Sequence, residues 1–242
     1  MTWTELRTAC KRQSDYIITL FLTNELSLWL TWFLVKTRVT PNQITAASIA
    51  TGLGCALAYA FGYFLLGSLL LFLSHIFDCT DGNLARAKSE FSPIGKWLDM
   101  AGDRISEAAI FIGAAIFFIR TGTSEYWILI SLGNATFLLI YYYIVDISLA
   151  MGLAKPVQNI GGFNFKGVHV KWGLLEPVIY GFIVLAPLGL IKVQLMILLI
   201  ISLSGISFQI LKTIKAFRLT EAHNRSVSDS EIAHSRLNRQ KL

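Results

Sequence analysis

The chain has 242 residues, of which 54% are hydrophobic, with a mean hydropathy of +0.58 and a net charge of +6. Its apolar residues occur in long blocks, a pattern that is typical of integral membrane proteins and argues against a soluble domain. The three cysteines show neither C-x-x-C pairing nor metal-ligand spacing, which argues against a disulfide framework and a zinc site.

Residues 1–40 are predicted to form a cytoplasmic N-terminal segment. The first dozen residues carry charges without an apolar core or a small-residue cleavage site, so no secretory signal peptide is visible. Further on, leucines and tryptophans recur over about 14 residues beside Lys36 and Arg38, which predicts an amphipathic helix lying on the membrane surface. The alternative is a seventh crossing that also includes residues 16–23.

Residues 41–216 contain apolar stretches near the length of about 20 residues that a helix needs to cross a bilayer. The predicted spans are 42–60, 63–84, 97–119, 126–149, 173–190 and 193–215. We therefore predict an all-α integral membrane protein with six transmembrane helices. No internal repeat indicates an inverted-repeat transporter.

The positions of lysine and arginine predict the orientation. Of the 21 basic residues, all but Arg120 and Lys192 fall on the side that holds both chain ends, which predicts that both termini face the cytoplasm. The net positive charge is explained by basic residues that set the orientation in the membrane and that attract anionic lipid. A nucleic-acid partner is not needed to explain this charge. Residues 217–242 are expected to be a polar, solvated cytoplasmic tail of a multi-pass protein of the cell membrane.

The stretch between the second and third predicted spans, "FDCTDGNLARAKSEFSPIGKWLDMAGDR", carries four aspartates at helical spacing. They are Asp78, Asp81, Asp99 and Asp103. Pro93 and Gly95 in the connection predict a turn, which would make the two helices antiparallel neighbours. Four carboxylates would then converge on one pocket, where divalent metal ions relieve their repulsion, and two metals about 4 Å apart suit phosphoryl chemistry.

Three other residues of this stretch agree with phosphate chemistry. Gly82 and Ala85 leave space beside the acidic face, and Arg86 offers a planar, permanently charged fork that suits a diphosphate. Small residues are also common where membrane helices pack closely, and this structural interpretation stays open for each of the two.

The spacing of these residues resembles the signature of the CDP-alcohol phosphotransferase family, D-x-x-D-G-x-x-A-R-x8-G-x3-D-x3-D, with every position filled. The stretch "TPNQIT" is similar to a Pro-Asn-x-x-Thr element of these enzymes. The resemblance implies that two Mg²⁺ or Mn²⁺ ions bind to the four aspartates and that Asp103 is the general base. It also implies a CDP site formed by Asn42, Thr45, Gly82, Ala85, Arg86 and Gly95.

By the same resemblance, the hydroxyl of an acceptor alcohol would attack the β-phosphate of a CDP-alcohol, and CMP would leave. The donor is left open between CDP-diacylglycerol and a CDP-polyol. We expect Lys155, Lys166 and Lys171, in the connection before the fifth span, to bind an acceptor with its own phosphate, such as an inositol phosphate. Their alternative role is to set the topology.

Several further residues have alternative interpretations. Asp146 and Glu176 are candidate acceptor contacts. Glu107 is expected to bond a neighbouring helix, and the alternative is that it faces the floor of the pocket. His75, one turn before Asp78, is expected to pack between helices, and the alternative is that it supports the metal site. The resemblance implies a homodimer, for which the small residues 113–115 would permit close packing. A cation transporter or channel is the rival function, and a catalytically inactive scaffold is the second. The apolar distal halves of the spans and the complete signature argue against them.

Overall fold

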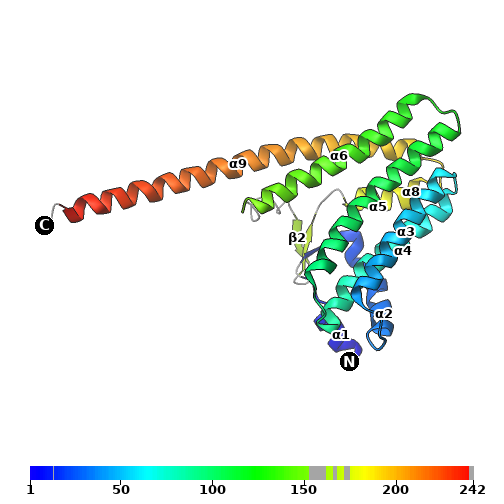
Figure 1. Cartoon of the computed structure of the whole chain (residues 1–242), viewed down its shortest axis with the longest axis horizontal. Helices are drawn as coiled ribbons and strands as arrows, with labels where there is room; N and C mark the ends of the chain where they lie inside the picture. The colour runs from blue at the N-terminus through cyan, green and yellow to red at the C-terminus, as the bar shows by residue number, and fades with distance from the viewer. Residues whose placement is uncertain (13, 153–161, 166–167, 172–174, 240–242) are drawn as a thin grey trace.

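The computed structural model describes residues 1–12, 14–152, 162–165, 168–171 and 175–239, and most of them are helical (Figure 1). The longer helices are α3 (Pro41–Ala60), α4 (Phe64–Lys88), α5 (Pro93–Arg120), α6 (Glu125–Ala150), α8 (Leu175–Leu185) and α9 (Ile191–Arg239). The N-terminal segment holds α1 (Trp3–Ala9), the π-helical turn η1 (Thr19–Thr23) and α2 (Asn24–Leu34). Three short strands are β1 (Ser14–Tyr16), β2 (Gly162–Phe165) and β3 (Val168–Lys171).

The sequence determines where the helices around the aspartates begin and end. Thr40 caps α3 in a capping box with Gln43, and Pro41 is its first residue. The α4 helix ends at Ser89, which adopts a left-handed conformation with φ of 57°. Ser92 then caps α5 by accepting a hydrogen bond of 3.0 Å from the Gly95 amide. These signals place the two halves of the aspartate signature on separate helices joined by a four-residue turn.

Four helices in the described part of the chain are long and apolar enough to cross a membrane, as an integral membrane protein requires. They are Pro41–Ala60, Phe64–Lys88, Glu125–Ala150 and Ile191–Arg218. The third predicted span corresponds to α5, which is long enough at 28 residues but carries the charged residues of the signature. The fifth corresponds to α8, which has only 11 residues. The count of six spans therefore remains a prediction.

The prediction of an all-α chain is wrong in one respect, because the three strands form a small sheet in the order β1-β3-β2. β1 is parallel to β3, and β2 is antiparallel to β3, so that Val170 pairs with Asp15 on one side and with Phe163 on the other. The strands have three or four residues each and lie far apart in sequence, so they lack the long alternating pattern that would reveal them. The sheet ties the N-terminal segment to the connection between α6 and α8.

The α3 helix is the centre of the bundle, because it packs along both α4 and α5. Ser48 on α3 donates a hydrogen bond of 2.9 Å to the Ser74 carbonyl on α4. The α5 helix also packs against α6, and α6 packs against α9. Aromatic rings fill the core between these layers, with the Phe182 ring 5.7 Å from Tyr59 and 5.4 Å from Phe111. Beyond this core, α9 extends away as one long helix toward the C-terminus (Figure 1).

The small residues 113–115 pack α5 against α3 within the same chain. A Cβ added to Gly113 would collide with the backbone of Ala56, and Ala114 and Ala115 are buried. Gly113 therefore permits close packing of α5 on α3 within one chain. The homodimer, and whether residues 113–115 take part in its face, remain predictions.

The N-terminal helices expose an aromatic surface. Trp3 stacks on Trp29 with ring centroids 4.6 Å apart, while Trp29 and Phe33 are 53% and 61% exposed and Leu28 is buried. At 11 residues, α2 is too short to cross a bilayer by itself. An exposed aromatic face opposite a buried one is what a surface helix needs, and its contact with the membrane remains a prediction.

Candidate active site

The structure brings three of the four aspartates together. One carboxylate oxygen from each of Asp78, Asp99 and Asp103 lies within 4.8 Å of the other two. Asp78 comes from α4, whereas Asp99 and Asp103 lie one turn apart on α5. Because α3 packs on both helices, it holds these side chains at a fixed separation.

Asp81 lies outside this group and faces α3. Asp81 follows Asp78 by three residues on α4, which corresponds to a difference of about 60° around the helix axis, so the two side chains point in different directions. The carboxylate of Asp81 accepts a hydrogen bond of 2.6 Å from the Thr45 hydroxyl, and both residues are buried. Thr45 comes from the "TPNQIT" stretch, which thus contacts the aspartate signature directly.

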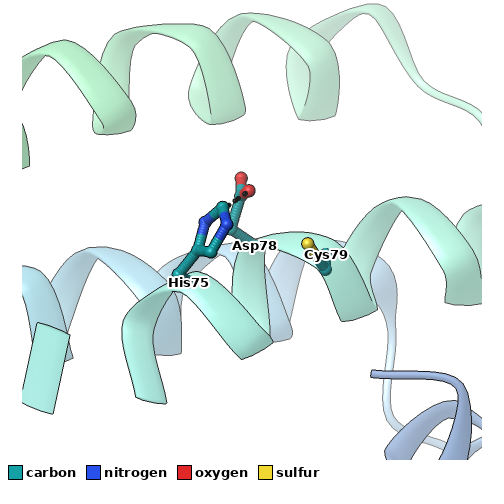
Figure 2. Close-up of side chains that lie close together, drawn as sticks. All are labelled: His75, Asp78 and Cys79. Carbon is teal, nitrogen blue, oxygen red and sulfur yellow. Dashed lines mark ion pairs between the residues drawn. The ribbon is translucent and has the colours of Figure 1, made fainter. Parts of the chain in front are cut away.

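The chemistry of the three-aspartate cluster fits a divalent metal. Carboxylate oxygens are hard ligands that suit Mg²⁺ and Mn²⁺, and such ions relieve the repulsion between neighbouring carboxylates. His75, Asp78 and Cys79 also lie close enough to share an ion, as Figure 2 shows on α4. That set contains a soft sulfur ligand, which suits zinc or copper rather than magnesium.

His75 is held from two sides. Its Nδ1 atom is 3.7 Å from Asp78 Oδ2, the contact drawn as a dashed line in Figure 2, and its Nε2 atom is 3.2 Å from the Thr19 hydroxyl of η1. The imidazole therefore lies between Asp78 and the N-terminal segment. This arrangement agrees with a supporting role for His75 beside the aspartate cluster.

A cavity of about 490 Å³ lies beside the cluster. All the residues predicted to bind CDP line it: Asn42, Thr45, Gly82, Ala85, Arg86 and Gly95. Asp81 and Asp99 also line this cavity. Asp78 and Asp103 line a second cavity of about 50 Å³ that is closed by α3 and α8 residues such as Ser48 and Ile179. Asp99 therefore belongs to both the cluster and the large cavity.

The guanidinium of Arg86 folds back over Gly82 within the cavity. A Cβ at Gly82 would lie 3.5 Å from Arg86 Nη2, so the glycine leaves this space open. Arg86 Nη2 donates a hydrogen bond of 2.7 Å to the side-chain oxygen of Asn83. Arg86 lines the cavity, which places a permanently charged guanidinium where it can meet a phosphate.

Sequence reasoning missed two residues of this site. Lys96 lines the large cavity and adds a positive charge next to Gly95. Asn83 contacts Arg86 but stands at a variable position of the signature, so the pattern carries no signal for it. For Lys96, its place directly after the signature glycine was the available signal.

The predicted acceptor contacts are only partly visible. Lys155 and Lys166 lie outside the described residues, and Lys171 is the last residue of β3, where its backbone pairs with Tyr16. Asp146 is exposed on α6. Their role in binding an acceptor remains a prediction.

Two other acidic residues make contacts that stabilise the fold. Glu107 is buried and accepts hydrogen bonds of 3.0 Å from Arg104 and 3.3 Å from Tyr142 on α6, as expected for a bond to a neighbouring helix. Glu176 accepts hydrogen bonds from the amides of Ile18 and Thr19 at the start of η1, and its role as an acceptor contact remains a prediction.

Comparison with known proteins agrees with the family resemblance of the aspartate signature. Residues 38–204 match the sequence model of the CDP-alcohol phosphatidyltransferase family. The chain is 35% identical over 95 residues to the phosphatidylinositol phosphate synthase of Cutibacterium acnes, covering 39% of this chain and 46% of that protein. It is 32% identical over 111 residues to the bifunctional IPC transferase and DIPP synthase of Aquifex aeolicus, covering 46% of this chain and 26% of that protein. The match thus spans less than half the length of either relative.

Solved structures share the fold. The phosphatidylinositol phosphate synthase of Mycobacterium tuberculosis, in complex with manganese and citrate, superposes with a TM-score of 0.60 at 22% identity, covering 79% of this chain and 88% of that one. The same enzyme with CDP-DAG bound gives a TM-score of 0.59 at 22% identity, covering 79% of this chain and 93% of that one.

Proposed function

Because the chain belongs to the CDP-alcohol phosphatidyltransferase family, we propose that it transfers a phosphoalcohol group from a CDP-alcohol to the hydroxyl of an acceptor alcohol and releases CMP. One observation carries the proposal. The cavity that contains all the candidate CDP-binding residues shares Asp99 with the cluster of three aspartates. A nucleotide in the cavity would therefore present its diphosphate to that cluster.

We assign donor binding and proton transfer to different residues of the site. Arg86 lines the cavity and offers its guanidinium to the diphosphate, while Gly82, Ala85 and Gly95 keep the cavity open beside the backbone. The aspartates would hold two divalent ions, which neutralise the diphosphate and stabilise the leaving phosphate.

Asp103 is the residue that we assign as general base. The acceptor hydroxyl gives its proton to the Asp103 carboxylate, and the oxygen of that hydroxyl forms a bond to the β-phosphorus of the donor. The bond between the β-phosphorus and the oxygen that bridges the two donor phosphates breaks. CMP then carries away the bridging oxygen and the electron pair. Asp103 lies one turn from Asp99 on α5, next to where the donor phosphates would lie.

For the substrates, we propose CDP-diacylglycerol as donor and a polyol phosphate, such as inositol phosphate, as acceptor. Relatives named phosphatidylinositol phosphate synthase and archaetidylinositol phosphate synthase support this choice, as does a structural neighbour that binds CDP-DAG. A phosphate on the acceptor would also explain basic residues such as Lys171 in the connection before α8. A CDP-polyol donor is the second candidate, favoured by the relative named IPC transferase and DIPP synthase.

The site is proposed to face the cytoplasm in a multi-pass protein of the cell membrane. Basic residues gather on the side of the chain that holds the aspartate signature, which supports this orientation. A lipid donor would then enter from the bilayer and a water-soluble acceptor from the cytoplasm. We further propose a homodimer, by analogy with the family.

The decisive experiment measures CMP release by purified protein in detergent or lipid with Mg²⁺ or Mn²⁺. CDP-diacylglycerol and CDP-inositol are offered separately, each with inositol, inositol phosphate, glycerol and glycerol phosphate. We expect CMP with CDP-diacylglycerol and inositol phosphate, and its loss in Asp103→Asn. If folded, metal-binding protein releases no CMP with any pair, the proposal fails, and ion-flux assays in vesicles would then test the transporter alternative.

A further inference from the structure

Asn83 is a fully buried polar residue at a variable position of the aspartate signature. Its backbone follows Gly82 on α4, and its side chain lies between α4 and α2. A buried amide must satisfy both its donor and its acceptor groups, because each unpaired group costs free energy. The partners of Asn83 therefore show what holds it.

The amide of Asn83 connects α2 to Arg86. Its Nδ2 atom donates a hydrogen bond of 2.7 Å to the Ser27 hydroxyl and a longer one of 3.4 Å to the side-chain oxygen of Asn24. Its Oδ1 atom accepts the hydrogen bond of 2.7 Å from Arg86 Nη2. Asn83 thus contacts the candidate donor site on one side and the N-terminal segment on the other.

The proton on Ser27 determines which way the Asn83 amide faces. The Ser27 hydroxyl donates its single proton to the Asn24 carbonyl at 2.8 Å, so its oxygen can only accept from Asn83. The NH₂ group of Asn83 must then face Ser27, and its oxygen must face Arg86. If the Asn83 amide were flipped, its NH₂ group would face the Arg86 guanidinium, and two donors would oppose each other. The Ser27 oxygen would then accept no hydrogen bond from Asn83.

The backbone of Asn83 is held from the same side. The Cys10 thiol donates a hydrogen bond of 3.3 Å to the Asn83 carbonyl oxygen. Burial raises the pKa of the Cys10 thiol, which keeps its proton in place at neutral pH. The N-terminal segment therefore contacts both the backbone and the side chain of this residue.

We propose that Asn83 is a positioning residue that holds the Arg86 guanidinium in the donor cavity, and that α2 fixes the orientation of Asn83 through Ser27. The inference rests on the proposed function, because it takes Arg86 to bind the donor diphosphate. It adds a role for residues before position 38, where the match to the family begins. With Nη2 held by Asn83, the Arg86 guanidinium is already placed at the cavity and loses less side-chain freedom when a ligand binds.

The test measures binding of CDP itself, by isothermal titration calorimetry in detergent with Mn²⁺. Asn83→Leu removes the acceptor for Arg86 while keeping a side chain of similar length, and we expect CDP to bind about tenfold more weakly. Ser27→Ala keeps Asn83 but removes the nearer acceptor of its NH₂ group, so we expect a smaller loss of about threefold. Each variant is compared with the wild type by thermal unfolding in the same detergent.

Thr31→Val is the matched control. Thr31 is buried on α2, one turn after Ser27, and its hydroxyl bonds the Ser27 carbonyl at 2.7 Å. It therefore tests loss of a buried hydroxyl on the same helix away from Asn83. We expect CDP affinity to stay at the wild-type value, whatever the change in unfolding temperature.

A double-mutant cycle distinguishes positioning from a general structural effect. If Asn83 acts through Arg86, then Asn83→Leu weakens CDP binding in the wild type but adds little in an Arg86→Lys background. Equal losses in both backgrounds, or unchanged CDP affinity in folded Asn83→Leu and Ser27→Ala, would overturn the inference. If Asn83→Leu does not fold, Ser27→Ala in the two backgrounds completes the same cycle.

The outcomes also separate this inference from the proposed function. A wild-type protein that binds CDP but releases no CMP contradicts the proposed transfer, while the Asn83 series still decides the positioning role. If the wild-type protein catalyses the transfer and Asn83→Leu binds CDP as tightly as the wild type does, the positioning role alone is contradicted. No CDP binding by the wild type overturns both.

Discussion

The Thr45 hydroxyl donates a hydrogen bond of 2.6 Å to the carboxylate of Asp81, joining α3 to α4 in the wall of the large cavity. The two residues are 4% and 6% exposed, so the bond is largely buried. The short "TPNQIT" stretch and the aspartate signature, read separately in the sequence, thus form one structural unit.

Replacing Thr45 by valine is expected to lower kcat/KM for CMP release about tenfold, because the buried Asp81 carboxylate loses its donor. The unfolding temperature is expected to fall as well. Thr51→Val is the matched control, since Thr51 lies on the same helix and, within the described part of the chain, its hydroxyl bonds only to α3 carbonyls, at 2.8 and 2.9 Å. Equal activity in the two variants would show that the bond does not serve the site.

Asp103→Asn should reduce CMP release by about a hundredfold or more, the usual contribution of a general base. An amide cannot accept the proton of the acceptor hydroxyl, yet it keeps the size of the side chain. CDP affinity should change far less than turnover, and calorimetry beside the activity assay measures both. Glu125→Gln, at the exposed start of α6, controls for loss of a carboxylate elsewhere. A variant that turns over normally would remove Asp103 from its assigned role.

Chelation of divalent ions should abolish CMP release, and added Mn²⁺ or Mg²⁺ should restore it. Asp78→Asn should require a higher metal concentration for half-maximal activity, because the variant has one carboxylate fewer in a cluster of three. Metal titrations of activity, and of intrinsic fluorescence without substrate, would measure the change. Unaltered metal affinity in this variant would argue against the cluster as the metal site.

Gly95→Ala is expected to impair both α5 and the donor cavity. Its Cβ would lie 2.7 Å from the Ser92 hydroxyl that caps the helix and 2.5 Å from Asn42 Oδ1. Disruption of the cap should cost about 1 kcal/mol of stability, and displacement of Asn42 should weaken CDP binding. The comparison is Gly54→Ala on α3, where a Cβ meets only Leu70 Cδ1 at 3.5 Å. Calorimetry and thermal unfolding of the two variants test this; similar CDP affinities would contradict it.

Much of this architecture follows from local sequence signals. The apolar blocks predict where the long helices begin to within a few residues, because caps such as Thr40 and Ser92 fix these positions. The end of α9 is different, because this helix continues to Arg239, well beyond the predicted end of its span at residue 215. Helical spacing also predicts that Asp99 and Asp103 share a face. It does not show that Asp81 turns toward α3, because that depends on which helix packs on α4.

Other features depend on contacts between distant residues. The strands are too short for periodicity to reveal them, and the small residues 113–115 did not indicate which helix they contact. Asn83 is the clearest case, because its position in the signature accepts any residue and its role comes from Ser27 on another helix. Spacing within a motif predicts chemistry, whereas contacts between segments determine geometry.

The pairing of β1 with β3 also has a consequence for how the protein is made. β1 cannot find its partner until the connection after α6 has been synthesised, and the nearby bond from Ile18 to Glu176 joins residues 158 positions apart. Contacts of such long sequence separation form late, since closing a long loop costs entropy that local helix pairs avoid. We therefore expect the helical hairpins of the membrane domain to assemble first and β1 to pair with β3 only afterwards.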